Sequence, residues 1–508
     1  GKILYEMNTF RIKKVTGTYS ELLETYGFAN FLKKIFDSLG ERDSKIMIAD
    51  RTTFFEVTVN TDITDEMIER VHYFSPFKYI KTKEDKDVSA YSDCYDYPLQ
   101  KKWKKERNDE LQRAYKEFQG KEKKEERDRQ IKEIESRYDV DVAHDVYSQI
   151  CTPNNFPSFD KLFGNFHHNR EIFPLLVKEI LAYYGENTYD SKGFEKQLKG
   201  KSFAKNITAT QLYNPSQGQG LNKLKSDGLN RKNFDSSWVA ETMKISGALS
   251  DMVCQLVKVG NSYDLKVAVP EYKKIGWGSK RALILAFKKY LKGNTPIKID
   301  ILDILLLTEK LVEFTAIEGK PCNVRNSVTG LHTVYQKDLG QNKAVVNIGF
   351  LQVPDFIEIG TEDEKAGWIE ILEEQRQIIG SIDELGSTIQ GLMWYRDFIS
   401  GSDLNSFFRF SFWYGTYLSN QLSNRKYARA FTVESLNKFY MSMDTKLREV
   451  VENKGFVAVA KAIRQSTVNL QYTPKENRKY EVRYGVAQAL QVKSKTPEDL
   501  AEYIGEFI

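Results

Sequence analysis

The strongest constraint on the fold is a change of hydrophobic periodicity near residue 360. Before that point, segments that alternate apolar and polar residues, as half-buried strands do, lie between helical segments. One alternating segment runs from Thr52 to Val59, with Phe55 and Val57 on one face. Beyond residue 360, apolar residues recur almost wholly at spacings of three and four, which is typical of helices packed on one side. The sequence therefore predicts an α+β protein, with a mixed α/β part over 1–360 and a helical bundle over 361–508.

Local patterns predict individual elements. Gly260 and the two residues after it separate two β-rich runs and indicate a hairpin over 253–269. A strand-like run over 345–359 contains Pro354, which we expect to interrupt its pairing. Apolar residues over 433–450 predict one helix, with Gly455 as its stop.

The segment 99–139 is distinguished by its charge. Lys101 to Arg137 holds 14 basic and 10 acidic residues with few apolar ones. This pattern predicts an exposed helical insertion with salt-bridged surfaces. An arm that follows nucleic-acid phosphates is the alternative.

Composition excludes several classes of protein. The 508 residues are 41% hydrophobic and 29% charged, which is typical of soluble globular chains and not of disordered, collagenous or membrane proteins. The most apolar helical segment, 299–317, is broken by charges, so we expect no membrane span. We see no secretory signal. Cys94, Cys151, Cys254 and Cys322 lie far apart without a C-x-x-C pair, which indicates a reducing, cytoplasmic setting.

Motifs of known catalytic chemistry are incomplete. Gly200-Lys201-Ser202 resembles the end of a phosphate-binding loop, but Glu195 stands where that loop begins with glycine. Gly218-Gln219-Gly220 opens like a dinucleotide fingerprint, yet Lys223 replaces the third glycine. His144-Asp145 is similar to the metal-binding pair of HD hydrolases, without further histidines at useful spacing. We therefore predict no catalytic residue, no metal site and no cofactor.

The chain has 75 basic and 70 acidic residues, a net charge of +5, so the positions of the charges matter more than their sum. Between Lys201 and Lys232 there are six basic residues and one acid, Asp227, together with amides and glycines. Cations bind phosphates, amides read base edges, and glycines let the backbone approach closely. A polar surface loop with ordinary turn glycines is the alternative. The candidate nucleic-acid-binding residues are Lys201, Lys205, Asn214, Gln217, Gly218, Gln219, Gly220, Asn222, Lys223, Lys225, Arg231 and Lys232.

A second concentration, from Arg409 to Arg483, has 14 basic and six acidic residues. Cations cannot serve a packed core, and a bundle with one basic face forms a sequence-independent groove for a nucleic-acid strand. The aromatic residues between Phe407 and Tyr417 are expected to be mainly core. The candidates here are Arg409, Arg425, Lys426, Arg429, Lys461, Arg464, Arg478 and Arg483.

The residues at these two concentrations resemble a known family. The segment 214–223, Asn-Pro-Ser-Gln-Gly-Gln-Gly-Leu-Asn-Lys, is followed by Trp238, Glu241, Lys244 and Gly247. It is similar to the glycine-rich signature of the large subunit of type I CRISPR surveillance complexes (Cascade), nearest to type I-B. The segments 462–468 and 483–490 resemble the end region of that family. Gln219 stands where the family has lysine, which favours an amide role over a phosphate role.

The resemblance implies a non-catalytic scaffold in a complex guided by crRNA. It implies that the chain engages the protospacer-adjacent motif in target double-stranded DNA, holds the displaced single strand, and contacts the backbone and small subunits of the complex. It also implies a docking surface for a helicase-nuclease. The bundle resembles the separate small subunits, and Met393 is suitably placed for an internal start.

Two other functions remain open on the sequence alone. One is a metal-dependent nuclease whose carboxylates are not singled out by any motif. The other is a scaffold that binds only proteins, its basic faces matching acidic partners.

Overall fold

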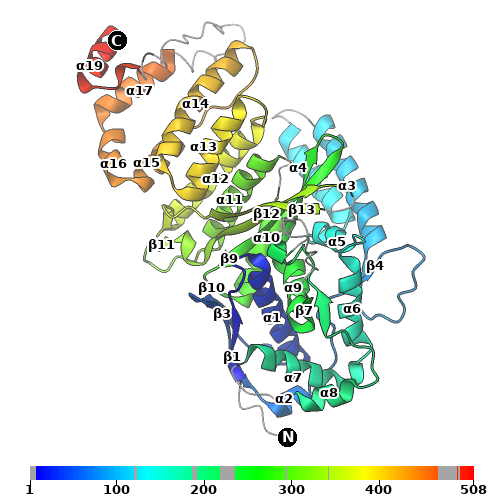
Figure 1. The fold of residues 1–508 in the computed structure, drawn as a ribbon. Helices are drawn as coiled ribbons and strands as arrows, with labels where there is room; N and C mark the ends of the chain where they lie inside the picture. The colour runs from blue at the N-terminus through cyan, green and yellow to red at the C-terminus, as the bar shows by residue number, and fades with distance from the viewer. Residues whose placement is uncertain are drawn as a thin grey trace, which may run out of the picture. The chain divides into compact units, whose positions relative to one another are not determined.

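The computed structural model describes residues 7–118, 123–185, 191–217, 235–291, 295–340, 343–466, 489 and 492–507. The chain divides into two compact units, each described by itself below. Unit 1 comprises 1–289 and 327–350, and unit 2 comprises 290–326 and 351–508. The class is α+β with a helical carboxyl-terminal region, as predicted (Figure 1). Segments 290–326 and 351–360, which were predicted to lie in the α/β part, belong to the same compact unit as the carboxyl-terminal helices.

Unit 1 contains two four-stranded sheets, ordered β1-β3-β2-β10 and β13-β12-β9-β8. The predicted strand near Thr52 is β3, and the predicted hairpin at Gly260 joins β8 to β9 in antiparallel register. Pro354 lies beyond the end of β13, in accord with its expected effect on pairing. The strands are β1 (Met7–Lys13), β2 (Ile46–Asp50), β3 (Phe54–Ile63), β8 (Val253–Val259), β9 (Ser262–Tyr272), β10 (Lys274–Gly276), β12 (Val328–Asp338) and β13 (Lys343–Gln352). The short pairs β4 (Tyr79–Lys81) with β5 (Cys94–Asp96), and β6 (Asn206–Thr208) with β7 (Asp235–Ser237), complete the sheets.

Two helices cross closely in the centre of unit 1, α1 (Tyr19–Ser38) and α9 (Trp238–Asp251) (Figure 1). A Cβ atom added at Gly27 would lie 1.8 Å from the carbonyl oxygen of Met243. One added at Gly247 would lie 1.9 Å from the carbonyl oxygen of Leu23. Only glycine at both positions permits this backbone contact, since such distances are far inside van der Waals separation.

The charged segment 99–139 forms two helices, α3 (Tyr97–Glu117) and α4 (Lys124–Arg137), which pack against each other. Ala114 and Ile134 are buried, while most described neighbours are exposed or half-buried. The predicted helical insertion is therefore confirmed. The other helices of unit 1 are α2 (Asp65–Glu69), α5 (His144–Ile150), α6 (Phe156–His167), α7 (Phe173–Tyr184), α8 (Lys192–Leu198) and α10 (Trp277–Lys289), with short 3₁₀ turns η2 (Arg170–Ile172) and η3 (Pro215–Gln217).

Unit 2 is built on the helix α11 (Pro296–Phe314), which packs against α12 (Glu362–Ser381) and α13 (Thr388–Gly401). The acids that interrupt the apolar sequence of α11 hold this packing together. Glu309 accepts from Arg376 of α12 at 2.8 Å, and Asp300 pairs with Arg396 of α13 at 2.9 Å. The remaining elements are α14 (Leu404–Ser423), α15 (Val433–Met443), α16 (Thr445–Val451), α17 (Lys454–Ser466), α19 (Pro497–Phe507), the 3₁₀ turn η5 (Val324–Asn326), and the paired strands β11 (Cys322–Asn323) and β14 (Glu358–Ile359).

Two predictions about these helices are wrong. The single helix expected over 433–450 is two helices, α15 and α16, because Asp444 has extended backbone angles and ends the first. Gly455 lies in the first turn of α17, which begins at Lys454, and does not stop a helix. The Asn453 side chain accepts from the backbone N–H groups of Gly455 and Phe456 at 2.9 and 3.2 Å and so caps this helix start. Within the described residues, every helix is too short or too polar to cross a bilayer.

Candidate nucleic-acid interface

The glycine-rich signature begins in a buried part of unit 1. Tyr19 Oη and Ser20 Oγ, at the start of α1, donate to the carbonyl oxygens of Leu212 and Tyr213 at 2.9 and 2.7 Å. These two hydrogen bonds fix the chain immediately before Asn214. The other end of the signature is fixed as well, because β7 pairs with β6 and runs directly into α9.

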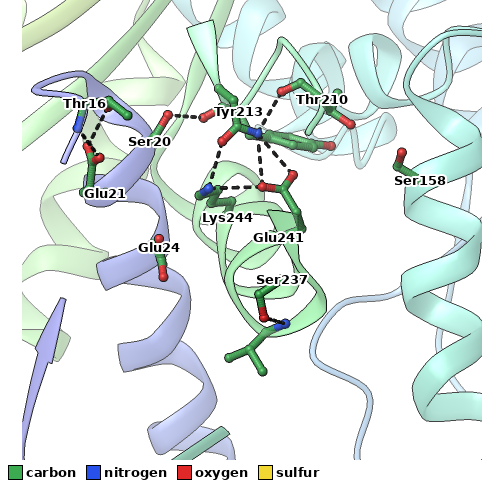
Figure 2. Close-up of polar contacts among 12 residues, drawn as sticks. Thr16, Ser20, Glu21, Glu24, Ser158, Thr210, Tyr213, Ser237, Glu241 and Lys244 are labelled. Carbon is green, nitrogen blue, oxygen red and sulfur yellow. Dashed lines mark hydrogen bonds and ion pairs between the residues drawn. The ribbon is translucent and has the colours of Figure 1, made fainter. Parts of the chain in front are cut away.

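Asn214 is held by two charged side chains of α9. Its Nδ2 donates to both carboxylate oxygens of Glu241 at 3.1 Å and to the carbonyl oxygen of Thr210 at 3.0 Å. Lys244 Nζ donates to Asn214 Oδ1 at 2.8 Å and to Glu241 Oε1 at 3.1 Å. Figure 2 shows Glu241 and Lys244 next to each other and facing the segment around Thr210 and Tyr213. We call Asn214, Glu241 and Lys244 the anchor.

The anchor is almost completely shielded from water. The exposed fraction is 1% for Asn214, 1% for Glu241 and 7% for Lys244. Burial alone would lower the pKa of Lys244, but the carboxylates of Glu241 and Glu24 outweigh it and raise that pKa. Burial raises the pKa of Glu24, against the effects of Lys244 and of a hydrogen bond from Tyr184. Lys244 is therefore charged at neutral pH, and it compensates the carboxylate of Glu241.

This placement gives Asn214 a structural role. A side chain with its donors and acceptor engaged inside the protein does not reach a base edge. The structure thus lends no support to Asn214 as a reading residue, and it makes Asn214 the fixed base from which 218–234 begins. Glu241, Lys244 and Gly247 were visible in the sequence only through the family resemblance. In the structure the first two hold Asn214, and Gly247 allows the close crossing of α1 and α9.

Lys201 and Lys205 are the other described candidates in unit 1. Lys201 forms an ion pair with Glu171, and Lys205 with Glu195. All four side chains are substantially exposed, between 30% and 57%. Exposed pairs contribute only about 0–1 kcal/mol, so these carboxylates reduce the local positive charge without fixing the lysines.

Half of the predicted site lies outside the described residues. Gln217 ends the described segment, and its side chain is not described. The residues in the undescribed segments are Gly218, Gln219, Gly220, Asn222, Lys223, Lys225, Arg231, Lys232, Arg478 and Arg483.

The cations of unit 2 fall into two groups. Arg429 donates to Gln377 and lies 3.9 Å from Glu374, and Arg464 donates to the carbonyl oxygen of Phe431 at 3.2 Å, so these two stabilise the bundle. Arg409, Arg425, Lys426 and Lys461 are exposed. The side chains of this second group are therefore accessible to solvent.

Arg425 has an unusual backbone conformation. Its φ is +57°, in the left-handed region, and the backbone N–H of Lys426 donates to the carbonyl oxygen of Gln421 at 2.9 Å. This is the ending of a helix at which glycine is strongly preferred. Compared with glycine, arginine at this left-handed position costs about 1 kcal/mol of backbone free energy but places a cationic side chain at the end of the helix.

The aromatic residues of α14 are divided between core and surface. Phe407, Phe410 and Tyr414 are buried, which confirms the expectation of a core role for them. Phe408 and Phe412 are 43% and 37% exposed, on either side of Arg409 in sequence. Sequence reasoning missed this difference, although residues 408 and 412 share one helix face by their spacing of four.

The histidine–aspartate pair is structural in this fold. His144 is 5% exposed and its Nδ1 shares a hydrogen bond with Tyr95 Oη at 2.6 Å. Burial lowers the pKa of His144 to about 4, and Asp145 forms an ion pair with Lys104. Among the described residues, no three His, Cys, Asp or Glu side chains are grouped so as to hold a metal ion.

Comparison with known proteins adds no assignment. No family model matches the chain, and no curated protein matches it significantly.

Proposed function

We propose that this protein is the non-catalytic large subunit of a cytoplasmic, crRNA-guided DNA surveillance complex. In this role it engages the protospacer-adjacent motif, stabilises the opened duplex and the displaced strand, and helps to recruit a helicase-nuclease. Its other partners are the crRNA and the backbone and small subunits of the complex.

One observation carries the proposal. Four of the residues that carry the resemblance lie in the described core of unit 1. Asn214, Glu241 and Lys244 form the anchor, and Gly247 lies where α1 crosses α9. The amide-rich and glycine-rich segment 218–234 lies between two ends that are both fixed to this rigid part of unit 1. A recognition segment that reads a short duplex motif benefits from such a fixed base, because less freedom is lost on binding.

The exposed cations of unit 2 support the second half of the role. Arg409 lies on α14 and Lys461 on α17, while Lys426 lies in the turn after α14, and all three side chains are exposed. Polyanion binding by such residues is independent of base sequence. In RNA-guided recognition, base pairing with the guide supplies most of the sequence discrimination. The protein then has two tasks, reading a brief motif and holding backbones.

Purification of the tagged full chain from its native cells tests the proposal. We expect it to carry RNA of one defined length, with a constant repeat-derived part and a variable part. Absence of RNA, or RNA of random length and sequence, would contradict the proposal and favour a scaffold that binds only proteins.

A second experiment distinguishes the proposed function from the alternative that the protein is a metal-dependent nuclease. The chain purified alone is incubated with single-stranded DNA and Mg²⁺ or Mn²⁺. We expect no sustained cleavage, and turnover that tracks with the protein through successive columns would overturn the non-catalytic assignment.

A further inference from the structure

Unit 1 contains a pocket that the proposed function does not use. Its volume is about 380 Å³, at the lower end of the range of about 300–1,000 Å³ for small-molecule sites. It lies among the carboxyl-terminal turn of α1, the connections 73–75 and 91–93, α6 and η2. Its walls include four aromatic rings, Tyr73, Phe74, Tyr91 and Phe163, and two cations, Lys34 and Arg170.

The aromatic walls are held in place by their neighbours. Tyr91 stacks on Tyr79 with ring centroids 3.9 Å apart and meets Phe163 edge-on at 5.4 Å. Tyr73 and Phe74 both meet Phe173 edge-on, at 5.2 and 5.0 Å. These rings lose little freedom when a flat ligand packs against them, because their orientation is already set.

Lys34 and Arg170 keep hydrogen-bond donors for a ligand. Lys34 Nζ donates to the carbonyl oxygens of Ser75 and Pro76 at 2.8 and 3.0 Å, which leaves one of its three N–H groups. The Arg170 guanidinium lies 4.6 Å from the centre of the Tyr73 ring and donates to His167 Nδ1 at 2.7 Å, which leaves most of its five. Burial lowers the pKa of Lys34 to about 8, so the amine is still mainly protonated at neutral pH.

The acids at the pocket are neutralised from outside it. Asp37 forms an ion pair with Lys33, and Asp93 lies 3.4 Å from Lys78. Within the described part of the chain, neither Lys34 nor Arg170 forms an ion pair with a carboxylate. Together with Lys33 and Lys78, the cations in and around the pocket outnumber the two acids that line it.

We propose that this pocket binds a single nucleotide, with the base against the aromatic rings and the phosphate at Lys34 and Arg170. Stacking on aromatic side chains contributes about 1–3 kcal/mol per base, and arginine binds phosphate in a bidentate geometry. A free nucleoside monophosphate and the phosphorylated end of a strand share this chemistry. The inference does not depend on the proposed function, because it rests on the pocket alone.

Isothermal titration calorimetry on the full chain tests the ligand class. The probes are AMP, UMP, adenosine, inorganic phosphate and a 5′-phosphorylated tetranucleotide. We expect saturable binding of the monophosphates, at least tenfold tighter than adenosine or phosphate. A tetranucleotide that binds tighter than the monophosphates identifies a strand end as the source, and the reverse identifies a free nucleotide. If no probe binds, or if phosphate alone binds as well as AMP, the proposal fails.

Three variants test the location. Arg170→Ala should weaken AMP binding about tenfold or more, because it removes charge-assisted hydrogen bonds. Ser92→Trp, at an exposed lining position, should block the pocket without changing its charge. Lys161→Ala removes an exposed cation of α6 that does not line the pocket and should leave affinity unchanged. Unaltered affinity in both pocket variants, with melting temperatures like that of the wild type, would place the ligand elsewhere and overturn the inference. The two proposals can fail separately. If the chain binds AMP but carries no guide RNA when purified from its native cells, the proposed function is refuted and the nucleotide pocket is supported.

Discussion

The two regions expected to engage nucleic acid differ in the burial and pairing of their charged side chains. At the glycine-rich signature, the described charges of Glu241 and Lys244 are buried and paired with each other and with Asn214. On unit 2, Arg409, Lys426 and Lys461 are exposed. The comparison teaches that a charged residue in a signature need not touch the ligand. Its charge can instead hold in place the ends of a neighbouring segment that binds the ligand.

Loss of the anchor cation should have the largest effect. Lys244→Met leaves the Glu241 carboxylate buried without its compensating charge, and breaking such a pair costs about 3–5 kcal/mol. Urea denaturation with hydrogen exchange of the α9 amides reports this loss within unit 1. Lys161→Met, at an exposed position, should change stability by no more than about 0.5 kcal/mol.

A second substitution sharpens this result. Adding Glu241→Gln to Lys244→Met removes the uncompensated charge and should recover part of the lost stability. If Lys244→Met were within about 1 kcal/mol of the wild type, the anchor would not be the rigid base described above.

The buried histidine should make unit 1 sensitive to acid. The pKa of His144 is about 4 in the folded state, against an ordinary value near 6.5. Between these pH values the unfolded state binds a proton at His144 that the folded state does not. The stabilisation that the neutral His144 gives to the folded state is therefore complete above pH 6.5 and is lost as the pH falls toward 4. We expect a loss of about 2 kcal/mol between pH 7 and pH 5. His144→Gln should flatten this dependence in denaturation experiments, and an equal slope in the variant would contradict the assignment.

Arg425 offers a smaller and more discriminating test. Arg425→Gly relieves the left-handed backbone and should stabilise unit 2 by roughly 0.5–1 kcal/mol, while it weakens binding to single-stranded DNA. Ser402, at the end of α13, also has a left-handed backbone, with a φ of +53°, so Ser402→Gly is a suitable control. It should gain similar stability with unchanged affinity. Equal affinity of Arg425→Gly and the wild type would remove Arg425 from the strand-binding surface.

Elements with a strong local pattern could be predicted from the sequence. The strand β3, the hairpin of β8 with β9, and the pair α3 and α4 all follow from periodicity, turn residues and charge within a short window. The fold class follows from the same signals. The partition into units could not be predicted, because Glu309 of α11 finds its partner Arg376 67 residues later.

The candidate site shows the same limit. Asn214 has the composition of a reading residue, and only contacts 27 and 30 residues away, with Glu241 and Lys244, show that it is buried. The nucleotide pocket draws its lining from segments between Lys34 and Arg170 that share no motif. Long-range packing of this kind leaves no periodic trace in a single sequence.

The most direct test of the division between reading and holding is the ratio of affinities for duplexes with and without the recognised motif, measured on the guide-loaded protein. Gln217→Ala with Gln219→Ala should reduce this ratio toward one, whereas Gln197→Ala with Gln390→Ala, two exposed amides elsewhere, should not. Arg409→Ala with Lys426→Ala should weaken both duplexes alike and flatten the salt dependence by roughly 0.7 to 0.9 for each lost phosphate contact. A ratio that is unchanged in the glutamine variant, or that falls in the arginine and lysine variant instead, would contradict the account.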